Sequence, residues 1–462
     1  MRYVSTRGDA PSLGFADVLL TGLAADGGLY VPETWPSLPA AVPGADYAAT
    51  AAAVMAPFVV SEDSPEISAA DLERLCREAY ATFRHPAVAP LVQIDDRQWL
   101  LELFHGPTLA FKDIALQLVG RMFDHVLATR DERITIVGAT SGDTGSAAID
   151  GVRGCDRVDI VILYPAGRTS EVQRRQMTTV DASNVHAVAV EGTFDDCQDL
   201  VKAMFADAPF RDRLRLSAVN SINWARVMAQ VVYYVTTART LAGPIDVTVP
   251  TGNFGNVLAG WIARRMGAGI DGLVVASNSN DILSRFINER DMSTTGVVPT
   301  LSPSMDIQVS SNVERLLFEM NGRDGARTAA QLAGFRSSGR LDVDDGAFDR
   351  WVAATFRAAS VDDPATLAEI ARVHRETGLS IDPHTATGTA VARRLAGDRP
   401  MVTLATAHPA KFPDAVERAT GLRPSLPGAL SDLMSRPERT STLPVDLAAV
   451  QRFVEGVSRA TG

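Results

Sequence analysis

The chain has 462 residues, 46% of them hydrophobic and 21% charged, which is long enough for two or three domains and excludes a disordered or fibrous protein. Its net charge of -11 argues against a nucleic-acid partner, because phosphate backbones are bound by basic surfaces. The sequence has no apolar run of the ~18 residues that a membrane span requires, no secretory leader, and no cysteine spacing typical of a disulfide framework or a metal site. We therefore expect a cytoplasmic protein without a metal or a membrane partner.

The first 92 residues are expected to form an N-terminal segment or domain. A proline-rich stretch from Val31 to Gly44 predicts irregular packing or a linker. The run from Asp71 to Phe83 has apolar residues at helical spacing, and Asp71 stands where the N-cap of that helix would lie. This part of the chain is therefore predicted to contribute helices rather than a sheet.

From Trp99 onwards, short apolar strands alternate with helices, which is typical of mostly parallel sheets covered on both faces. We expect two such α/β domains, at 93–235 and 236–462. A mainly helical insertion is expected at about 313–376, where no strand is evident before the Ile381 region. The candidate strands are Trp99 to Phe104, Ile134 to Val137, Val158 to Leu163, Val185 to Val190, Ile245 to Val249, Leu273 to Ala276 and Met401 to Leu404.

Two of these strands are followed by glycine-rich turns that open helices, and ligands bind at such carboxyl ends of strands. The turn Gly252-Asn253-Phe254-Gly255-Asn256 lets the backbone approach an anion, and the helix behind it supplies unpaired N–H donors, so a phosphate site is predicted there. The turn Ser141-Gly142-Asp143-Thr144-Gly145 presents hydroxyls and N–H groups that would suit a carboxylate. Capping of the following helix by Ser141 or Asp143 is the alternative, and both interpretations can hold at once.

Lysine is rare in this sequence. Among 44 basic residues only Lys112, Lys202 and Lys411 are lysines. Positions that need only a positive charge have been filled by arginine, so the remaining lysines are enriched in roles that a guanidinium cannot perform, such as that of an amine nucleophile. Lys112 follows a candidate strand and precedes a helix, where its side chain can project into a cleft. An ordinary surface lysine is the alternative.

Several motifs, taken together, resemble the threonine synthase family. They are LAADGGLYVPE at 23–33, HGPTLAFKD at 105–113, SGDTG at 141–145, GNFGN at 252–256, SMDIQVSSNVER at 304–315, DPHTATG at 382–388 and TAHPAKF at 406–412. The resemblance implies a fold-type II pyridoxal-phosphate (PLP) enzyme. It also implies conversion of O-phospho-L-homoserine and water to L-threonine and phosphate by γ-elimination and β-addition of water.

The resemblance assigns roles to individual residues. Lys112 would carry PLP as a Schiff base, and the hydroxyl of Thr406 would meet the pyridine nitrogen. Many enzymes of this architecture have Asn where this chain has Asp143, and that Asn contacts the cofactor hydroxyl, so Asp143 is expected beside the cofactor. The phosphate of the cofactor would lie on the turn formed by Gly252, Asn253, Phe254, Gly255 and Asn256.

Four other residues are candidates for the pocket. Ser141 and Thr144 are expected to bind the carboxylate of the substrate. His384 is expected either to line the pocket or to have a structural role. Lys411 lies five residues after Thr406, so its compact ammonium group could bind the phosphate of the substrate, and a structural ion pair is the alternative.

Two other functions fit the same motifs. A threonine synthase-like phospholyase would release phosphate and give 2-oxobutyrate, and the motifs do not separate this outcome from threonine formation. A protein of another class, a non-catalytic α/β protein that binds a phosphate metabolite, would use only the glycine turn. In either case the expected partner is a small molecule, and we expect a monomer or a weak homo-oligomer.

Overall fold

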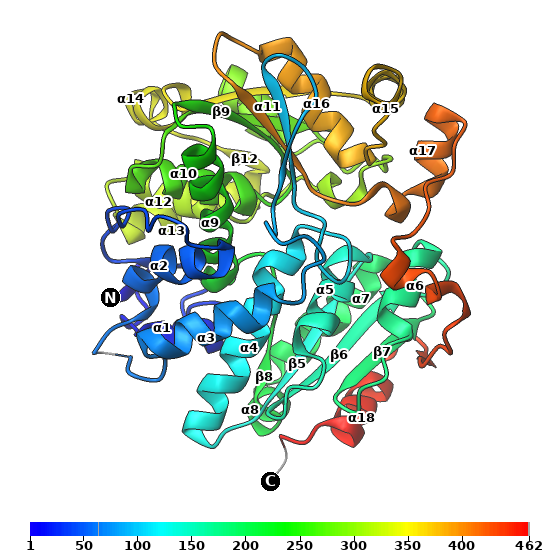
Figure 1. The fold of residues 1–462 in the computed structure, drawn as a ribbon. Helices are drawn as coiled ribbons and strands as arrows, with labels where there is room; N and C mark the ends of the chain where they lie inside the picture. Colours follow the sequence, from blue (N-terminus) through cyan, green and yellow to red (C-terminus); the bar gives the residue numbers. More distant parts are fainter. Residues whose placement is uncertain (63, 461–462) are drawn as a thin grey trace.

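The computed structural model describes residues 1–62 and 64–460, which form two parallel-sheet lobes and an N-terminal layer of helices. In Figure 1 the N-terminal helices lie at the side of the molecule, where α2 packs on α9 and α3 packs on α4. The elements of this layer are β1 (Tyr3–Ser5), α1 (Phe15–Thr21), β2 (Tyr30–Pro32), α2 (Tyr47–Val59) and α3 (Ala69–Tyr80). The strands β1 and β2 pair with each other in antiparallel fashion and belong to neither large sheet.

One lobe contains a six-stranded sheet in the order β13-β10-β9-β14-β4-β3, in which only β3 runs antiparallel to its neighbour. Helices α9 and α10 cover one face, and α15, α16 and α17 contribute apolar side chains to the other. The strands are β3 (Leu91–Gln93), β4 (Gln98–Glu102), β9 (Ile245–Pro250), β10 (Ile270–Ser277), β13 (Phe356–Ser360) and β14 (Met401–Ala405). The helices are α9 (Trp224–Thr240), α10 (Gly255–Met266), α15 (Asp363–Thr377), α16 (Pro383–Leu395) and α17 (Pro413–Thr420).

The other lobe contains an all-parallel sheet in the order β15-β7-β6-β5-β8. Its strands are β5 (Ile134–Ala139), β6 (Val158–Pro165), β7 (Val185–Val190), β8 (Leu216–Ser217) and β15 (Ser441–Leu443). Helices α4 and α5 cover one face, and α7 and α18 pack on the other, where Figure 1 shows α18 beside β7. The helices of this lobe are α4 (Lys112–Arg130), α5 (Asp143–Val152), α6 (Glu171–Thr178), α7 (Phe194–Ala206), α8 (Ala208–Arg213) and α18 (Leu447–Val457).

The segment between β10 and α15 is mainly helical, as predicted for 313–376, but it also contains strands that were not predicted, the longest of which is β13. Strand β13 pairs with β10 at the edge of the larger sheet, and the Ile381 region, where a strand was expected, is a loop before α16. The sequence of β13, FRAAS, has few of the apolar β-branched residues that mark a strand. The other elements here are α11 (Ile282–Glu289), β11 (Met292–Ser293), α12 (Val313–Met320), α13 (Gly325–Ser338), β12 (Arg340–Leu341) and α14 (Asp345–Phe348).

The predicted strands are confirmed, whereas one helix start and one boundary differ from expectation. Helix α3 is capped by Ser68, whose hydroxyl accepts from the backbone N–H of Asp71, and Asp71 is the reciprocal partner in this capping box rather than the N-cap. The domain predicted for 93–235 does not correspond to one sheet, because β4 lies in this range but pairs with β14 in the larger sheet. Within residues 1–62 and 64–460, no helix combines the length and the apolar character of a membrane span.

Candidate active site

Lys112 lies at the point where the two lobes meet. It is the first residue of α4, it is 8% exposed, and its Nζ lies 3.3 Å from Asp143 Oδ2 and 3.4 Å from Ser304 Oγ. Asp143 is the first residue of α5, so the N-termini of two helices face each other across this contact. The predicted cleft lysine is therefore buried against a carboxylate and a hydroxyl that come from two distant parts of the chain.

The electrostatics of the site favour a negative Asp143 and ease deprotonation of Lys112. Burial lowers the pKa of the Lys112 amine, and this effect exceeds the opposing attraction of Asp143. Burial would raise the pKa of Asp143, but the charges of Lys112 and Lys411 hold it well below its usual range. The N-terminus of α5 adds a partial positive charge beside the same carboxylate. Asp143 is therefore a fixed anion, and Lys112 is an amine that loses its proton more readily than a surface lysine.

Lys411 is fully buried on the opposite side of the same carboxylate. Its Nζ lies 2.7 Å from Asp143 Oδ1 and donates to the backbone carbonyl of Thr108 at 2.9 Å. This geometry corresponds to the ion pair that the sequence left open as the alternative to a contact with the substrate phosphate. Gln173 Nε2 also donates to Asp143 Oδ1, at 2.8 Å, so that oxygen already has two partners.

The glycine turn 252–256 connects β9 to α10 and has the features of an anion cradle. Helix α10 begins after Phe254, which has φ of 62°, and no side chain caps its first turn. The amide nitrogen of the buried Asn256 side chain has no hydrogen-bond partner among the described residues. A Cβ on Gly252 would lie 2.6 Å from the carbonyl oxygen of Ser304. Uncapped N–H donors, an unused amide and the absence of a side chain at Gly252 are what a bound phosphate requires.

Residue 304 connects this turn to Lys112. The Ser304 backbone borders Gly252, while its hydroxyl lies within reach of Lys112 Nζ. His384, at the start of α16, accepts a hydrogen bond from the backbone N–H of Ser304 through Nε2 at 3.2 Å, and its Nδ1 lies 2.9 Å from Asp382 Oδ1. Both ring nitrogens of His384 are therefore occupied by the protein. His384 thus holds the backbone of Ser304, the residue whose hydroxyl faces Lys112.

Thr406 follows the carboxyl end of β14, directly beside the segment that leads into α4. Its carbonyl accepts from the backbone N–H of Phe111 at 2.9 Å, and Ala407 forms an isolated bridge with Ala110. Thr406 is 6% exposed. The structure thus brings Thr406 to the same strand ends as Lys112, as the sequence predicted from two motifs almost 300 residues apart.

In the first glycine turn, 141–145, two hydroxyl groups form no hydrogen bond to another described residue. Thr140, not Ser141, holds the turn, because its Oγ1 accepts from the backbone N–H groups of Gly142 and Gly145. Ser141 is exposed and Thr144 is half-buried, and neither side chain hydrogen-bonds to another residue in the described part of the chain. These two hydroxyls therefore remain available to a ligand at the N-terminus of α5.

Two residues of the site were not predicted from the sequence. One is Ser304, as a contact of Lys112, and the other is Arg226. Arg226 lies in the first turn of α9, is 5% exposed, and has Nε and Nη1 without a partner among residues 1–62 and 64–460. Burial lowers its pKa to about 10, and its charge in turn lowers the pKa of Lys112. A buried guanidinium without a carboxylate is costly and marks a place for an external anion. Arginine was too common in the sequence to stand out.

The assembled residues fit a phosphorylated aldehyde cofactor together with an anionic substrate. Lys112 is a buried amine, and the turn 252–256 supplies a phosphate cradle next to it. The hydroxyls of Ser141 and Thr144 and the guanidinium of Arg226 supply further donors for anionic groups. An amine with a lowered pKa can form a covalent bond to an aldehyde and can afterwards transfer protons.

Comparisons with known proteins agree with this reading. A family model of pyridoxal-phosphate-dependent enzymes matches residues 82–407, and models of the threonine synthase N-terminus and C-terminal region match residues 2–80 and 385–454. The chain is 54% identical to threonine synthase of Pseudomonas aeruginosa and 42% identical to that of Corynebacterium glutamicum, in each case over 98% of both chains. The structure is similar to PLP-bound threonine synthase from Brucella melitensis, with a TM-score of 0.96 and 54% identity over 99% of this chain and 100% of that one. The predicted architecture and cofactor are thereby confirmed.

Proposed function

Because this chain belongs to the threonine synthase family of PLP-dependent lyases, we propose that it converts O-phospho-L-homoserine and water to L-threonine and phosphate, with Lys112 as the catalytic lysine. The surroundings of the three lysines support the choice of Lys112. Lys112 is buried within 3.4 Å of both Asp143 and Ser304, next to the cradle, whereas Lys202 is an exposed side chain paired with Asp199. The ammonium group of Lys411 already forms an ion pair with Asp143.

Lys112 would hold the cofactor and then move the proton. The chemistry that bound PLP supplies is withdrawal of electrons from Cα of the substrate. Lys112, once displaced by the substrate amine, would be the base that takes the Cα proton and then the Cβ proton as phosphate leaves Cγ. Protons would return to Cγ and Cα, and water would add its hydroxyl at Cβ. The lowered pKa of Lys112 favours the neutral amine that the first step needs.

The cofactor would be held by residues from three strand ends. The backbone N–H groups of the turn 252–256 would bind its phosphate, Thr406 would donate to or accept from its ring nitrogen, and Asp143 would lie beside its hydroxyl. A hydroxyl partner, unlike a carboxylate, does not force the ring nitrogen to stay protonated, which tempers the electron withdrawal. Lys411 would act by fixing the position and charge of Asp143.

The substrate has two anionic groups, and the site offers two sets of unused donors. We assign Ser141 and Thr144, at the N-terminus of α5, to the carboxylate. We assign Arg226 to the substrate phosphate, because its guanidinium is buried, has two nitrogens without a partner among the described residues, and lowers the pKa of Lys112. Charge-assisted hydrogen bonds from arginine suit a phosphate that must be bound firmly and then released as the leaving group.

The proposal is tested by product analysis on the cofactor-bound enzyme. Incubation with O-phospho-L-homoserine should release L-threonine and phosphate in equal amounts. Equal amounts of 2-oxobutyrate and phosphate without threonine would instead identify a phospholyase, and no phosphate release would point to a binding protein. Borohydride reduction followed by peptide mapping should locate the cofactor on Lys112, and Lys112→Ala should abolish turnover without changing the thermal midpoint by more than a few degrees. Label on Lys202 or Lys411 would contradict the assignment.

A further inference from the structure

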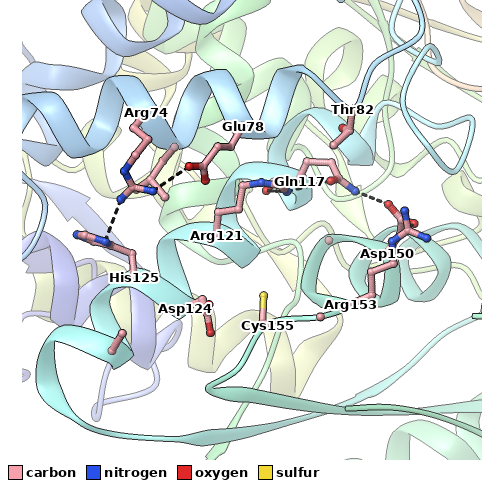
Figure 2. Close-up of a pocket in the computed structure, with 14 residues that line it drawn as sticks. Arg74, Glu78, Thr82, Gln117, Arg121, Asp124, His125, Asp150, Arg153 and Cys155 are labelled. Carbon is pink, nitrogen blue, oxygen red and sulfur yellow. Dashed lines mark hydrogen bonds and ion pairs between the residues drawn. The ribbon is translucent and has the colours of Figure 1, made fainter. Parts of the chain in front are cut away.

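A polar groove lies away from the active site, where α3, α4 and the end of α5 meet (Figure 2). Its volume is about 430 Å³, which is ample for a small metabolite. Its charged lining comes from all three helices and from the turn that follows α5: Arg74, Glu78, Arg121, Asp124, Asp150 and Arg153. No residue of this groove belongs to the site described above.

Four of these six charges neutralise each other. Arg74 Nη1 lies 3.0 Å from Glu78 Oε1, and Arg153 Nε lies 3.2 Å from Asp150 Oδ1. Asp150 also accepts a hydrogen bond from Gln117 Nε2 at 2.5 Å, one of the contacts drawn in Figure 2. These pairs form the walls of the groove and leave little attraction for a ligand.

The remaining two charges, Arg121 and Asp124, have no counterion within 4.0 Å among residues 1–62 and 64–460. Arg121 donates from Nη1 only to the carbonyl and side-chain oxygens of Gln117, at 2.7 and 3.0 Å, and no described carboxylate lies within 4.0 Å of it. Asp124 Oδ1 accepts only from the backbone N–H of Arg157, at 2.9 Å, and no basic side chain of the described residues lies within 4.0 Å. Both side chains are half-buried, so water compensates their charges incompletely.

We propose that this groove binds a free α-amino acid, with the carboxylate on Arg121 and the ammonium group on Asp124. The two side chains are three residues apart on α4 and therefore neighbours on the same helix face. A simple anion would satisfy Arg121 but would stand against Asp124, and a simple cation would have the reverse problem. A zwitterion whose charged groups share one carbon satisfies both.

A ligand here would touch the two helices that hold Lys112 and Asp143. Arg121 and Asp124 belong to α4, which begins at Lys112, and Asp150 lies in the last turn of α5, which begins at Asp143. The backbones of these helices are in direct contact beneath the groove, since a Cβ on Gly120 would overlap the carbonyl oxygen of Gly151. Lys112 lies about 14 Å along α4 from Arg121. Occupancy of the groove is therefore expected to alter the Lys112–Asp143 contact and with it the turnover rate.

Cys155 provides a local probe of occupancy. It lines the groove and is half-buried, whereas Cys76 and Cys197 are fully buried. In the cofactor-bound enzyme, the rate of N-ethylmaleimide modification at Cys155 is measured by peptide mass spectrometry. L-Alanine should slow this modification at least threefold. Propionate and ethylamine, which each carry one of the two charges, should not slow it at the same concentration.

Matched variants complete the test. Arg121→Met and Asp124→Asn should each remove the protection by L-alanine, because each leaves one charge of the zwitterion unpaired, and Asn can still accept from the N–H of Arg157. Arg372→Met, at an exposed surface pair with Glu376, should retain it. Titration calorimetry with L-alanine on wild type and Arg121→Met gives a second measurement that does not depend on thiol reactivity.

Three results would overturn the proposal: equal protection by propionate or ethylamine, protection that survives Arg121→Met, and identical calorimetric titrations of the two proteins. Protection of Cys155 with unchanged turnover would leave the binding site standing and overturn the coupling to Lys112. None of these outcomes depends on which reaction the active site performs.

Discussion

The carboxylate of Asp143 lies between two lysines, and these two lysines have different roles. Each of its oxygens faces one ammonium group, at 3.3 Å for Lys112 and 2.7 Å for Lys411. Once Lys112 is bound to a cofactor it no longer balances the carboxylate, so Lys411 becomes the lasting counterion of Asp143. A buried carboxylate that lost its partner would pay several kcal/mol or take up a proton.

We expect Lys411→Arg to impair catalysis without weakening phosphate binding. The ammonium group is fully enclosed, so a bulkier guanidinium would displace Asp143 or the Thr108 carbonyl, at an overpacking cost of about 1–3 kcal/mol. The turnover number should fall tenfold or more, while the inhibition constant for inorganic phosphate should stay unchanged. Steady-state kinetics with phosphate as inhibitor measures both.

Two further variants, Lys202→Arg and Arg226→Met, are compared with Lys411→Arg. Lys202→Arg, at an exposed side chain, should leave both constants unchanged. Arg226→Met should raise the inhibition constant for phosphate about tenfold, the effect of losing one charge-assisted hydrogen bond of ~1.5 kcal/mol. If Lys411→Arg raised that constant while Arg226→Met did not, the two assignments would have to be exchanged.

His408 is expected to make the fold sensitive to acid. Burial, with the nearby charges of Arg84 and His105, lowers its pKa to about 4, and its Nδ1 accepts from the backbone N–H of Ala410. The unfolded chain takes up this proton near the ordinary value of 6.5, before the folded protein does. Above pH 6.5 neutral His408 therefore makes its full contribution to the free energy of unfolding. This contribution, ~3 kcal/mol, is lost as the pH falls from 6.5 toward 4.

His408→Asn should flatten this dependence, because the Asn oxygen can accept the same hydrogen bond and does not titrate. The measurement is the difference in thermal midpoint between pH 8 and pH 5 for the variant and the wild type. A variant whose midpoint falls as steeply as that of wild type would show that other groups cause the acid sensitivity.

At the scale of single elements, the sequence predicted those parts of the site that local chemistry determines. A strand, a glycine turn and a helix follow one another at β5 to α5 and at β9 to α10, and both turns are read from a few adjacent residues. Prediction failed where the deciding contact is distant. Strand β13 forms because β10 has an edge with which it can pair. The N-cap of α3 is Ser68 and not Asp71, although either residue type can begin a helix.

The turn 252–256 makes a prediction at this scale. Gly252→Val should weaken PLP affinity tenfold or more, because its Cβ would lie 2.6 Å from the backbone oxygen of Ser304 and something must shift. Gly255→Val should have a smaller effect, since its nearest neighbour is the Asn312 side chain at 3.2 Å. Equilibrium titration of the apoenzyme with PLP, followed by absorbance, measures the difference.

The control for the turn is Gly334→Val in helix α13, where the added Cβ would have no neighbour within 4 Å among the described residues, apart from its own helix backbone. It should leave PLP affinity unchanged. Equal PLP affinities for Gly252→Val and this control would show that the turn 252–256 does not bind the cofactor.

At the scale of the whole molecule, the sheets are assembled from parts of the chain that no local pattern connects. Strand β4 joins β14 across 300 residues, and β15 joins β7 across 250, so neither lobe is a continuous segment. Residues such as Ser304 and Arg226 reach Lys112 only through this assembly. Their side-chain types are common in the sequence, so residue chemistry alone did not single them out. Ser304 opens one of the family motifs, whereas Arg226 lies in none of them. A cytoplasmic location and a monomer or weak homo-oligomer stay predictions.

The last 22 residues should be essential to the smaller lobe. Strand β15 extends the sheet beside β7, and α18 places Val450 and Val454, both fully buried, against Val188 and the buried Cys197 of α7. Ending the chain after residue 440 would expose this apolar face to water, at a cost of roughly 1.5–3 kcal/mol for each large side chain uncovered.

Cysteine reactivity reports this exposure directly, because the two buried cysteines lie in different layers of the molecule. Cys197 should become reactive toward N-ethylmaleimide in the chain that ends at residue 440, while Cys76, in helix α3 of the N-terminal layer, should remain protected. Equal reactivity of both thiols would mean that the whole chain unfolds. Continued protection of Cys197 would show that the five-stranded sheet keeps its cover without β15 and α18.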